Sequence, residues 1–317
     1  MRNLEEKPVK ILFLGSGWES VETLKSLNED PRFDIVGVIT TIDKPIGRNH
    51  VLTPSDVKKY ATENDIDVFH TERQEKKYRE ALDIFDPELV VCKAFGEIVP
   101  EFFIDYPQYK AINVHFSILP KYRGAVPIQK AILDGEKKTG ISIILMSKGL
   151  DEGDILKVYR EDILPKETNQ SLRKRLVKKS SEILGDTLED WINEKIEPQK
   201  QDSSKASYCW QKDISKKNAK VDWENMEAEY IERMVRAFIP WPITWTQWNG
   251  KRLKLFNTDI VECNYSKNPG ELFISNRNLL FSTKSKGVCI KVNLLQLEGK
   301  QKMSDQEFIN GNKLGLS

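Results

Sequence analysis

The side chains best suited to polar catalysis lie near the middle of the chain. Asn113 and His115 are two residues apart in an apolar, β-branched segment, so both project from one face of an extended strand. The turn 149–154 follows the next apolar segment and brings carboxylates to the same end of the predicted sheet, where Asp151 or Asp154 could brace the imidazole. These residues could move protons. The same pattern also suits a structural histidine that bonds backbone carbonyls.

Two other kinds of site are poorly supported. Gly15-Ser16-Gly17 follows an apolar run, as a dinucleotide-binding loop would, but Ser20 occupies the third glycine position and no acid ends the second strand. A plain strand-to-helix turn is the better interpretation. The four cysteines lie far apart with no Cys-x-x-Cys pair and no paired histidines, so we expect no zinc site and four reduced thiols; they are Cys92, Cys209, Cys263 and Cys289.

The first half of the chain alternates short apolar runs with longer amphipathic segments, which predicts βαβ units and a doubly wound, mostly parallel sheet of the α/β class. The predicted strands are 9–14, 35–40, 66–70, 89–94, 112–115 and 141–146. Apolar residues at every third position from Trp18 to Leu27 predict a first helix. Leucines at multiples of four predict a second over 172–192, with Thr168 or Asn169 as its N-cap.

The second half of the chain consists of short strand-like pieces separated by turns, a pattern that predicts a small C-terminal β-barrel. Short strand-like pieces at 244–248, 253–256, 278–281 and 288–292 are separated by Gly, Pro and Asn turns. The most polar stretch of the chain precedes this half. We therefore predict a catalytic domain over 1–194, a linker over 195–211 and a barrel domain over 212–317, which has 17 basic and 12 acidic residues.

The composition is that of an ordinary globular chain. It has 49 Lys and Arg against 48 Asp and Glu, with 39% hydrophobic residues, which argues against disorder, collagen and coiled coil. No stretch approaches the ~20 apolar residues that a membrane span needs, and the start of the chain lacks an apolar signal core. The cytoplasm is the expected location.

Several separated motifs resemble the folate-dependent formyltransferases, and the resemblance spans nearly the whole chain. Asn113-Val114-His115 is followed by the pattern Ser-x-Leu-Pro-x-Tyr-Arg-Gly-x-x-Pro over 117–127 and by Gly-Leu-Asp-x-Gly-Asp over 149–154. Further matching segments are 43–48, 94–100, 236–242 and 295–304.

The resemblance implies a formyl donor, 10-formyltetrahydrofolate, and places the chain in the branch that formylates the α-amino group of methionyl initiator tRNA. Attack by an amine on a formyl carbon builds an oxyanion, which the amide of Asn113 is suited to bind. His115 would move protons, and Asp151 would fix the tautomer of its ring and stabilise the imidazolium. Neither a nucleophilic Ser or Cys nor a metal is required, and we expect a monomer.

The resemblance also implies two sets of binding residues. The folate pocket would be lined by Phe95, Gly96, Ile98, Pro100, Ser117, Leu119, Pro120, Gly153 and Asp154. Contacts to tRNA would come from Lys44, Arg48, Lys251 and Arg252, although Asn49 and His50 stand where relatives carry further basic residues.

Two departures from the family pattern concern the first half. Gly15-Ser16-Gly17-Trp18 replaces the usual Gly-Thr-Pro-x-Phe turn, and Lys93 stands in a strand that is apolar in relatives. Lys93 could extend to solvent, pair with an acid, or touch the anionic folate tail.

Alternatives to the tRNA-directed transferase remain. The same fold and donor could serve an amino-sugar nucleotide as acceptor, or water in a deformylase. A catalytically inactive RNA-binding module is a third possibility, and a pyridine-nucleotide enzyme a fourth. The basic barrel and the segment 44–52 favour tRNA.

Overall fold

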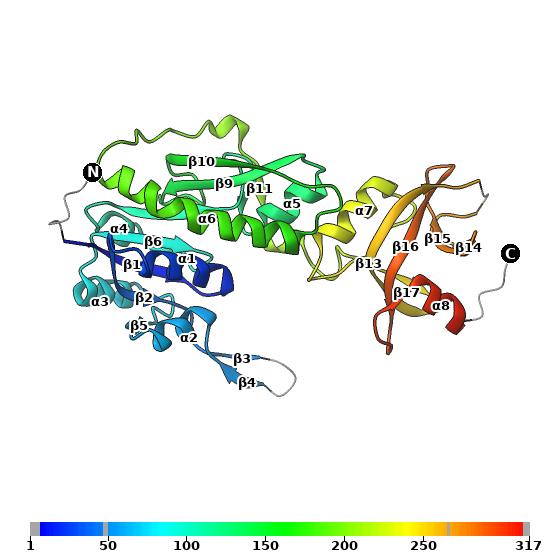
Figure 1. The fold of residues 1–317 in the computed structure, drawn as a ribbon, viewed down its shortest axis with the longest axis horizontal. Helices are drawn as coiled ribbons and strands as arrows, with labels where there is room; N and C mark the ends of the chain where they lie inside the picture. The colour runs from blue at the N-terminus through cyan, green and yellow to red at the C-terminus, as the bar shows by residue number, and fades with distance from the viewer. Residues whose placement is uncertain (1–6, 47–49, 265–266, 313–317) are drawn as a thin grey trace. The chain divides into compact units, whose positions relative to one another are not determined.

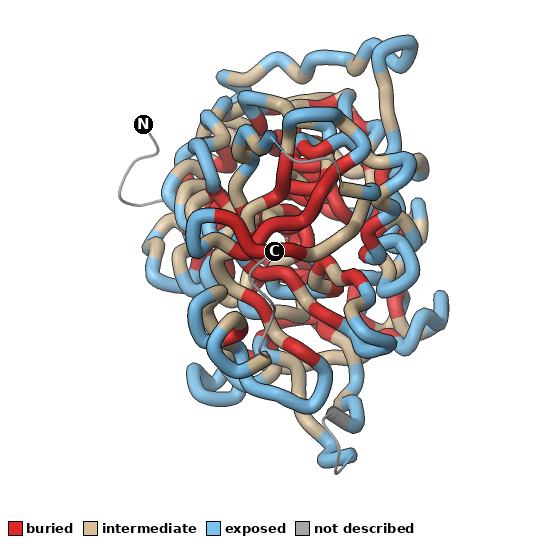
Figure 2. Tube along the Cα trace, turned by 90° about the vertical axis from the view of Figure 1, so that its right-hand side faces the viewer, coloured by how far each residue is buried: buried red, intermediate tan, exposed pale blue. Residues whose placement is uncertain are grey.

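The computed structural model describes residues 7–46, 50–264 and 267–312. The chain divides into two compact units (Figure 1). Unit 1 comprises Met1–Arg123, Gly140–Glu161 and Lys174–Ser207, and unit 2 comprises Gly124–Thr139, Asp162–Arg173 and Tyr208–Ser317. Figure 2 marks which stretches of the chain are buried, intermediate and exposed.

Unit 1 is built around a seven-stranded sheet in the order β10-β9-β7-β6-β1-β2-β5. The pairs β1–β2, β1–β6, β2–β5 and β6–β7 are parallel, whereas β7–β9 is antiparallel. The predicted mostly parallel sheet is therefore confirmed, and β10 is a strand that the sequence did not predict. The strands are β1 (Val9–Gly15), β2 (Phe33–Ile39), β5 (Val68–Phe69), β6 (Leu89–Lys93), β7 (Ala111–His115), β9 (Lys138–Leu145) and β10 (Ile155–Asp162).

Helices cover both faces of this sheet. Alternate strand residues such as Leu12 and Val90 pack with Tyr78 and Phe85 of α3 and Phe103 of α4, whereas α1 and α6 lie on the other face, where Lys93 of β6 meets both of them. The helices are α1 (Trp18–Asn28), α2 (Asp56–Glu63), α3 (Glu75–Phe85), α4 (Glu101–Asp105) and α6 (Asn169–Ile192). The two helices predicted from the sequence correspond to α1 and α6.

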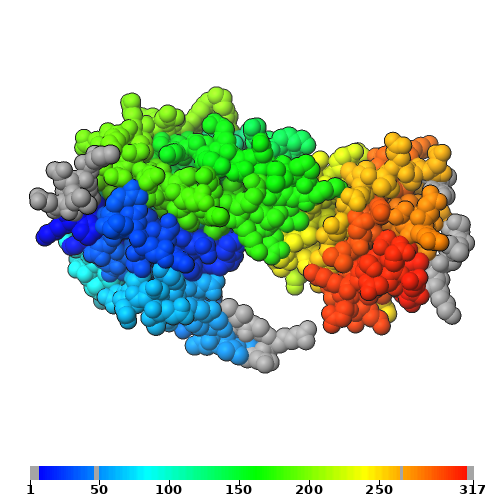
Figure 3. Space-filling model, viewed as in Figure 1, coloured from blue at the N-terminus to red at the C-terminus, as the bar shows by residue number. Residues whose placement is uncertain are grey.

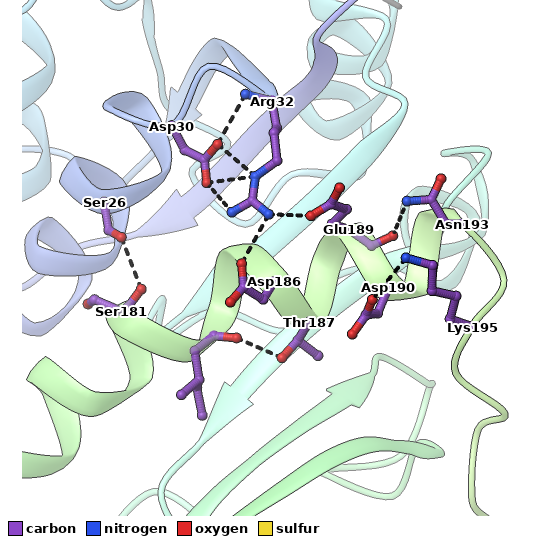
Figure 4. A network of polar contacts seen from close by, with 11 residues as sticks. Ser26, Asp30, Arg32, Ser181, Asp186, Thr187, Glu189, Asp190, Asn193 and Lys195 are labelled. Carbon is purple, nitrogen blue, oxygen red and sulfur yellow. Dashed lines mark hydrogen bonds and ion pairs between the residues drawn. The ribbon is translucent and has the colours of Figure 1, made fainter. Parts of the chain in front are cut away.

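An arginine fastens α6 to the turn before β2 (Figure 4). The guanidinium of Arg32 donates to Asp30 through Nε at 2.8 Å, to Asp186 at 3.0 Å and to Glu189. These carboxylates, Asp30 foremost, raise the pKa of Arg32 further above its ordinary value. Ser26 of α1 also donates to the carbonyl of Ser181 of α6 at 3.0 Å. The face of unit 1 at α1 and α6 is thus held by polar contacts.

Lys93 lies fully buried beneath this face, so it does not extend to solvent. Its Nζ donates to the hydroxyls of Thr23 at 2.7 Å and Ser180 at 2.6 Å, and lies 4.9 Å from the ring centroid of Phe116. Burial lowers the pKa of Lys93 to about 7, against the opposing charges of Glu19 and Glu22. Both hydrogen-bond partners of Lys93 are hydroxyl groups, which can accept from the charged or the neutral amine.

Unit 2 contains a curled antiparallel sheet in the order β12-β13-β16-β15-β14, with β17 paired to β16. This sheet agrees with the predicted barrel-like C-terminal fold. Its strands are β12 (Trp245–Trp248), β13 (Lys251–Glu262), β14 (Leu272–Ser275), β15 (Asn278–Ser282), β16 (Val288–Leu297) and β17 (Met303–Ser304). Helices α5 (Pro127–Leu133), α7 (Ala228–Ala237) and α8 (Asp305–Asn312) complete the unit.

Small elements complete the described chain. A two-stranded hairpin is formed by β3 (Lys44–Ile46) and β4 (Val51–Thr53), and β8 (Arg123–Gly124) pairs with β11 (Tyr208–Cys209). Two short 3₁₀ helices span Ser203–Lys205 and Gln211–Asp213. Among the described residues, no helix has the length and apolar character needed to cross a membrane.

The expectation of four reduced cysteines is wrong. Cys263 and Cys289 form a disulfide, with their Cα atoms 5.9 Å apart, while Cys92 and Cys209 are free and buried. The two residues are distant in sequence, but antiparallel pairing of β13 with β16 brings them together, since Val261 lies opposite Cys289. The separation of the two cysteines in sequence did not indicate this disulfide, because their proximity arises from the register of β13 against β16.

We expect replacement of Lys93 by Met to change how stability depends on pH. The pKa of Lys93 is about 7 in the fold against an ordinary value of 10.5, so the unfolded chain binds more protons between these values. The unfolding free energy of the wild type should therefore rise relative to that of Lys93→Met by ~1 kcal/mol per pH unit from about pH 7.5 to about pH 9.5.

Urea denaturation across this pH range measures the difference. Lys148→Met is a suitable control, because the Lys148 side chain is 82% exposed. A pH-independent difference between the wild type and Lys93→Met would show that Lys93 keeps its charge when buried.

Candidate functional site

Asn113, His115 and Asp151 come together in unit 1. Asn113 and His115 lie in β7, and Asp151 lies in the loop between β9 and β10. The Asn113 amide nitrogen donates to Asp151 Oδ1 at 3.1 Å, and His115 Nδ1 lies 3.4 Å from Asp151 Oδ2. The side chains of His115 and Asp151 are only 6% and 9% exposed. The acid that contacts the pair is therefore Asp151 and not Asp154, the other acid that the sequence offered.

The hydrogen bonds of His115 determine where its ring carries a proton. Nε2 lies 2.8 Å from the carbonyl oxygen of Tyr122. A carbonyl only accepts, so Nε2 carries hydrogen and the neutral ring has its lone pair at Nδ1, on the side of Asp151. Protonation at Nδ1 gives an imidazolium between a carbonyl and a carboxylate. The backbone of Tyr122 thus selects the tautomer, a role that the sequence interpretation gave to Asp151.

The loop that carries Asp151 is closely constrained. Asp151 has a φ of +53°, in the left-handed region, and the amide of Leu145 donates to the Asp154 carbonyl at 2.9 Å. A Cβ atom on Gly153 would lie 1.8 Å from the carbonyl oxygen of Leu145. A side chain is therefore excluded at residue 153, and the loop passes close against the end of β9.

Cys92 neighbours this group, since it pairs with Asn113 across β6 and β7. Burial, together with the charge of Asp151, raises the pKa of Cys92 to about 12. The thiol therefore stays protonated at neutral pH and is a poor nucleophile. Within the described ranges, no three His, Cys, Asp or Glu side chains are grouped as a metal site would need.

The residues assigned to a folate pocket by resemblance have varied environments. Phe95 is buried, whereas Ile98 is 92% exposed. Gly96 has a φ of +83° with open space where a side chain would start. Ser117 is buried and its hydroxyl donates to the Lys121 carbonyl at 2.6 Å. Pro100 immediately precedes α4, Leu119 is buried next to the cis bond to Pro120, and Asp154 is partly buried.

The residues assigned to tRNA are exposed where the structure describes them. Lys44 is exposed and lies in β3 of the hairpin. The hairpin segment projects from unit 1 in the surface view (Figure 3). Lys251 and Arg252 lie at the start of β13, and the guanidinium of Arg252 is 4.4 Å from the ring centroid of Trp245. Arg48 lies outside the described residues.

Two residues beside the trio were missed as site residues by the sequence interpretation. Arg123 is 1% exposed, and its guanidinium donates to Glu152 at 3.1 Å and to Gln201 at 2.9 Å. Arg123 was visible only as part of the motif Tyr-Arg-Gly, and Gln201 fell inside the predicted linker. A charged residue flanked by Tyr122 and Gly124 gave no sign that it would be buried.

Comparisons with known proteins place the chain in a family. A family model described as formyl transferase matches residues 9–188, and one described as formyl transferase, C-terminal domain, matches residues 213–313. The curated methionyl-tRNA formyltransferase of Clostridium novyi is 35% identical over 97% of this chain and 98% of its own length. The methionyl-tRNA formyltransferase of Caldicellulosiruptor saccharolyticus is 38% identical over 96% of this chain and 97% of its own.

A solved structure has the same fold at lower sequence similarity. The N-formyltransferase from Helicobacter canadensis, in complex with folinic acid and dTDP-3-aminofucose, superposes with a TM-score of 0.67 at 21% identity and covers 90% of this chain and 98% of its own. The two family models and the relatives that match along nearly the full length lead to one conclusion. The chain belongs to the formyl transferase family, and the two curated relatives named above, which it matches along nearly their full length, are methionyl-tRNA formyltransferases.

Proposed function

We propose that this chain transfers the formyl group of 10-formyltetrahydrofolate to the α-amino group of methionyl initiator tRNA. The main support for the proposal is that the side chains of Asn113 and His115 both contact the carboxylate of Asp151. Full-length relatives named methionyl-tRNA formyltransferase support the choice of acceptor. The activity belongs to the cytoplasm, where charged initiator tRNA is used, and we propose that a monomer performs it.

The amide of Asn113 binds the developing oxyanion. The amide nitrogen has two hydrogens, of which one is directed to Asp151 Oδ1. The other remains to donate to the formyl oxygen as the amine attacks. Because Asp151 holds the amide in place before reaction, little reorganisation is needed when charge develops on that oxygen.

The pair formed by His115 and Asp151 handles the proton. An α-amino group has an ordinary pKa of about 7.7–8.0, so a useful fraction is neutral and a strong base is unnecessary. As the new C–N bond forms, the amine loses a proton to the Nδ1 side of His115, where Asp151 stabilises the resulting imidazolium. The same proton then goes to N10 of the departing tetrahydrofolate as the C–N10 bond breaks.

The folate binds along the segments that flank the trio. Gly96 has a positive φ and no side chain, so a flat ring can approach its main chain, and exposed Ile98 offers an apolar contact. Gly153 brings backbone close to the end of β9. Phe95, Pro100, Ser117, Leu119, Pro120 and Asp154 complete the proposed pocket.

Basic residues provide charge for the tRNA phosphates. Lys44 on the hairpin and Lys251 and Arg252 on β13 are exposed, as phosphate contacts require. Arg48, which lies outside the described residues, is proposed for the same role. We assign catalysis to residues 1–194 and tRNA binding to 212–317, with 195–211 as the connecting segment.

Replacement of Asn113 by Ala should lower kcat by ~10²–10³-fold, because an oxyanion donor is lost. His115→Ala should also lower kcat by orders of magnitude, while thermal unfolding shows that both variants remain folded. Single-turnover formylation of methionyl initiator tRNA measures the effect. Asn28→Ala, at the exposed end of α1, is the control. Normal turnover in either site variant would refute the mechanism.

The acceptor can be determined directly with purified protein and 10-formyltetrahydrofolate. We expect formyl-methionyl-tRNA to form, and neither amino-sugar nucleotides nor water to accept the formyl group at a comparable rate. Acid-precipitable formyl label and chromatography of the sugar nucleotides report the products. If only the sugar nucleotide is formylated, the acceptor proposed here is wrong, although the fold and donor would still stand.

A further inference from the structure

The side chain of Gln201 lies against the loop that carries Asp151, although neither family model covers it. Its amide nitrogen donates to the carbonyl oxygens of Asp151 and Gly153, both at 2.8 Å. Its carbonyl oxygen accepts from Arg123, from Nε at 3.2 Å and from Nη2 at 2.9 Å. All these residues belong to unit 1.

This arrangement admits one orientation of the Gln201 amide. A guanidinium only donates and a backbone carbonyl only accepts, so a flipped amide would lose all four contacts. Both amide hydrogens and the amide oxygen are thus committed. Arg123 is 1% exposed and also donates to Glu152 Oε1 at 3.1 Å, so the loop from Asp151 to Gly153 is held at each of its three residues.

The loop needs such a restraint. Asp151 has a φ of +53°, a region that costs energy for a residue other than glycine. The backbone carbonyls of Asp151 and Gly153 both accept from the amide nitrogen of Gln201. By holding them, Gln201 fixes the backbone from which the Asp151 carboxylate reaches Asn113 and His115.

The same stretch of chain also braces the other partner of His115. Ser207 accepts at Oγ from the amide of Tyr122 at 2.9 Å, and its carbonyl accepts from the amide of Arg123 at 2.8 Å. Tyr122 has a φ of +61°, and its carbonyl receives the hydrogen of His115 Nε2. Residues 201–207 therefore support both groups that face the imidazole, one on each ring nitrogen.

We infer that Gln201 is a positioning residue for formyl transfer, which acts by holding Asp151 in line with Asn113 and His115. The inference rests on the proposed function. The hydrogen bonds of Gln201 go to Arg123 and to the backbone of Asp151 and Gly153, so its effect passes through the backbone of residues 151–153. Displacement of a reacting group by about 1 Å can cost ~10²-fold in rate, so a small shift of this loop is sufficient.

Gln201→Glu is the diagnostic substitution. The carboxylate keeps the size of the side chain and its pairing with Arg123, but it replaces the two donors with oxygen that repels the carbonyls of Asp151 and Gly153. We expect kcat to fall ~10–100-fold, with KM for both substrates within about threefold. The pH at which kcat is half-maximal should shift, because the environment of His115 changes; a purely structural role would leave that pH unchanged.

Gln199→Glu is the matched control, since it makes the same chemical change two residues away on an exposed side chain. Thermal unfolding checks that each variant is folded, and Gln201→Met is expected to show the same loss of kcat if Gln201→Glu does not fold.

A double variant tests whether Gln201 acts through Asp151. The variant with both Gln201→Glu and Asp151→Asn should turn over no more slowly than Asp151→Asn alone. An additive loss would overturn the inference, because Gln201 would then act independently of Asp151.

The result for the wild type separates the two proposals. Formyl transfer by the wild type and by Gln199→Glu, with Gln201→Glu equally fast and an unchanged pH profile, would overturn the role of Gln201 alone. Absence of transfer by the wild type would overturn the proposed function and this inference with it. Transfer by the wild type with a selective fall in kcat for Gln201→Glu supports both.

Discussion

The arrangement of the site depends on one carboxylate that is shared between two partners. Asp151 accepts from the amide of Asn113 through one oxygen and faces His115 through the other, with a side chain that is 9% exposed. A carboxylate with so little access to water must be compensated by donors within the protein. That requirement links the amide and the imidazole to a single group, and it brings residues 38 positions apart in sequence into contact.

The backbone supplies this geometry from several directions. Alternation along β7 puts Asn113 and His115 on one face, and the close passage of Gly153 against β9 places Asp151 opposite them. The carbonyl of Tyr122 takes the second nitrogen of the imidazole. Because each of these contacts involves main chain, the site depends more on loop conformation than on the number of polar side chains nearby.

Periodicity in the sequence predicted the strands of the unit 1 sheet except β10, together with helices α1 and α6, because apolar alternation and capping are local properties. It could not predict contacts that depend on register or on loop conformation. The disulfide between Cys263 and Cys289 follows from pairing of β13 with β16, and burial of Lys93 follows from the packing of α1 and α6 on β6. Gln201 looked like part of a polar linker because composition does not reveal what a side chain contacts.

A crystal structure with a stable formyl-folate analogue would show whether Asn113, His115 and Asp151 surround the formyl group. We expect the formyl oxygen to lie within about 3 Å of the Asn113 amide nitrogen, with the formyl carbon open to an amine beside His115 and with Asp151 still bridging the two residues. An analogue bound elsewhere on the protein, or a complex in which the three side chains separate, would contradict it.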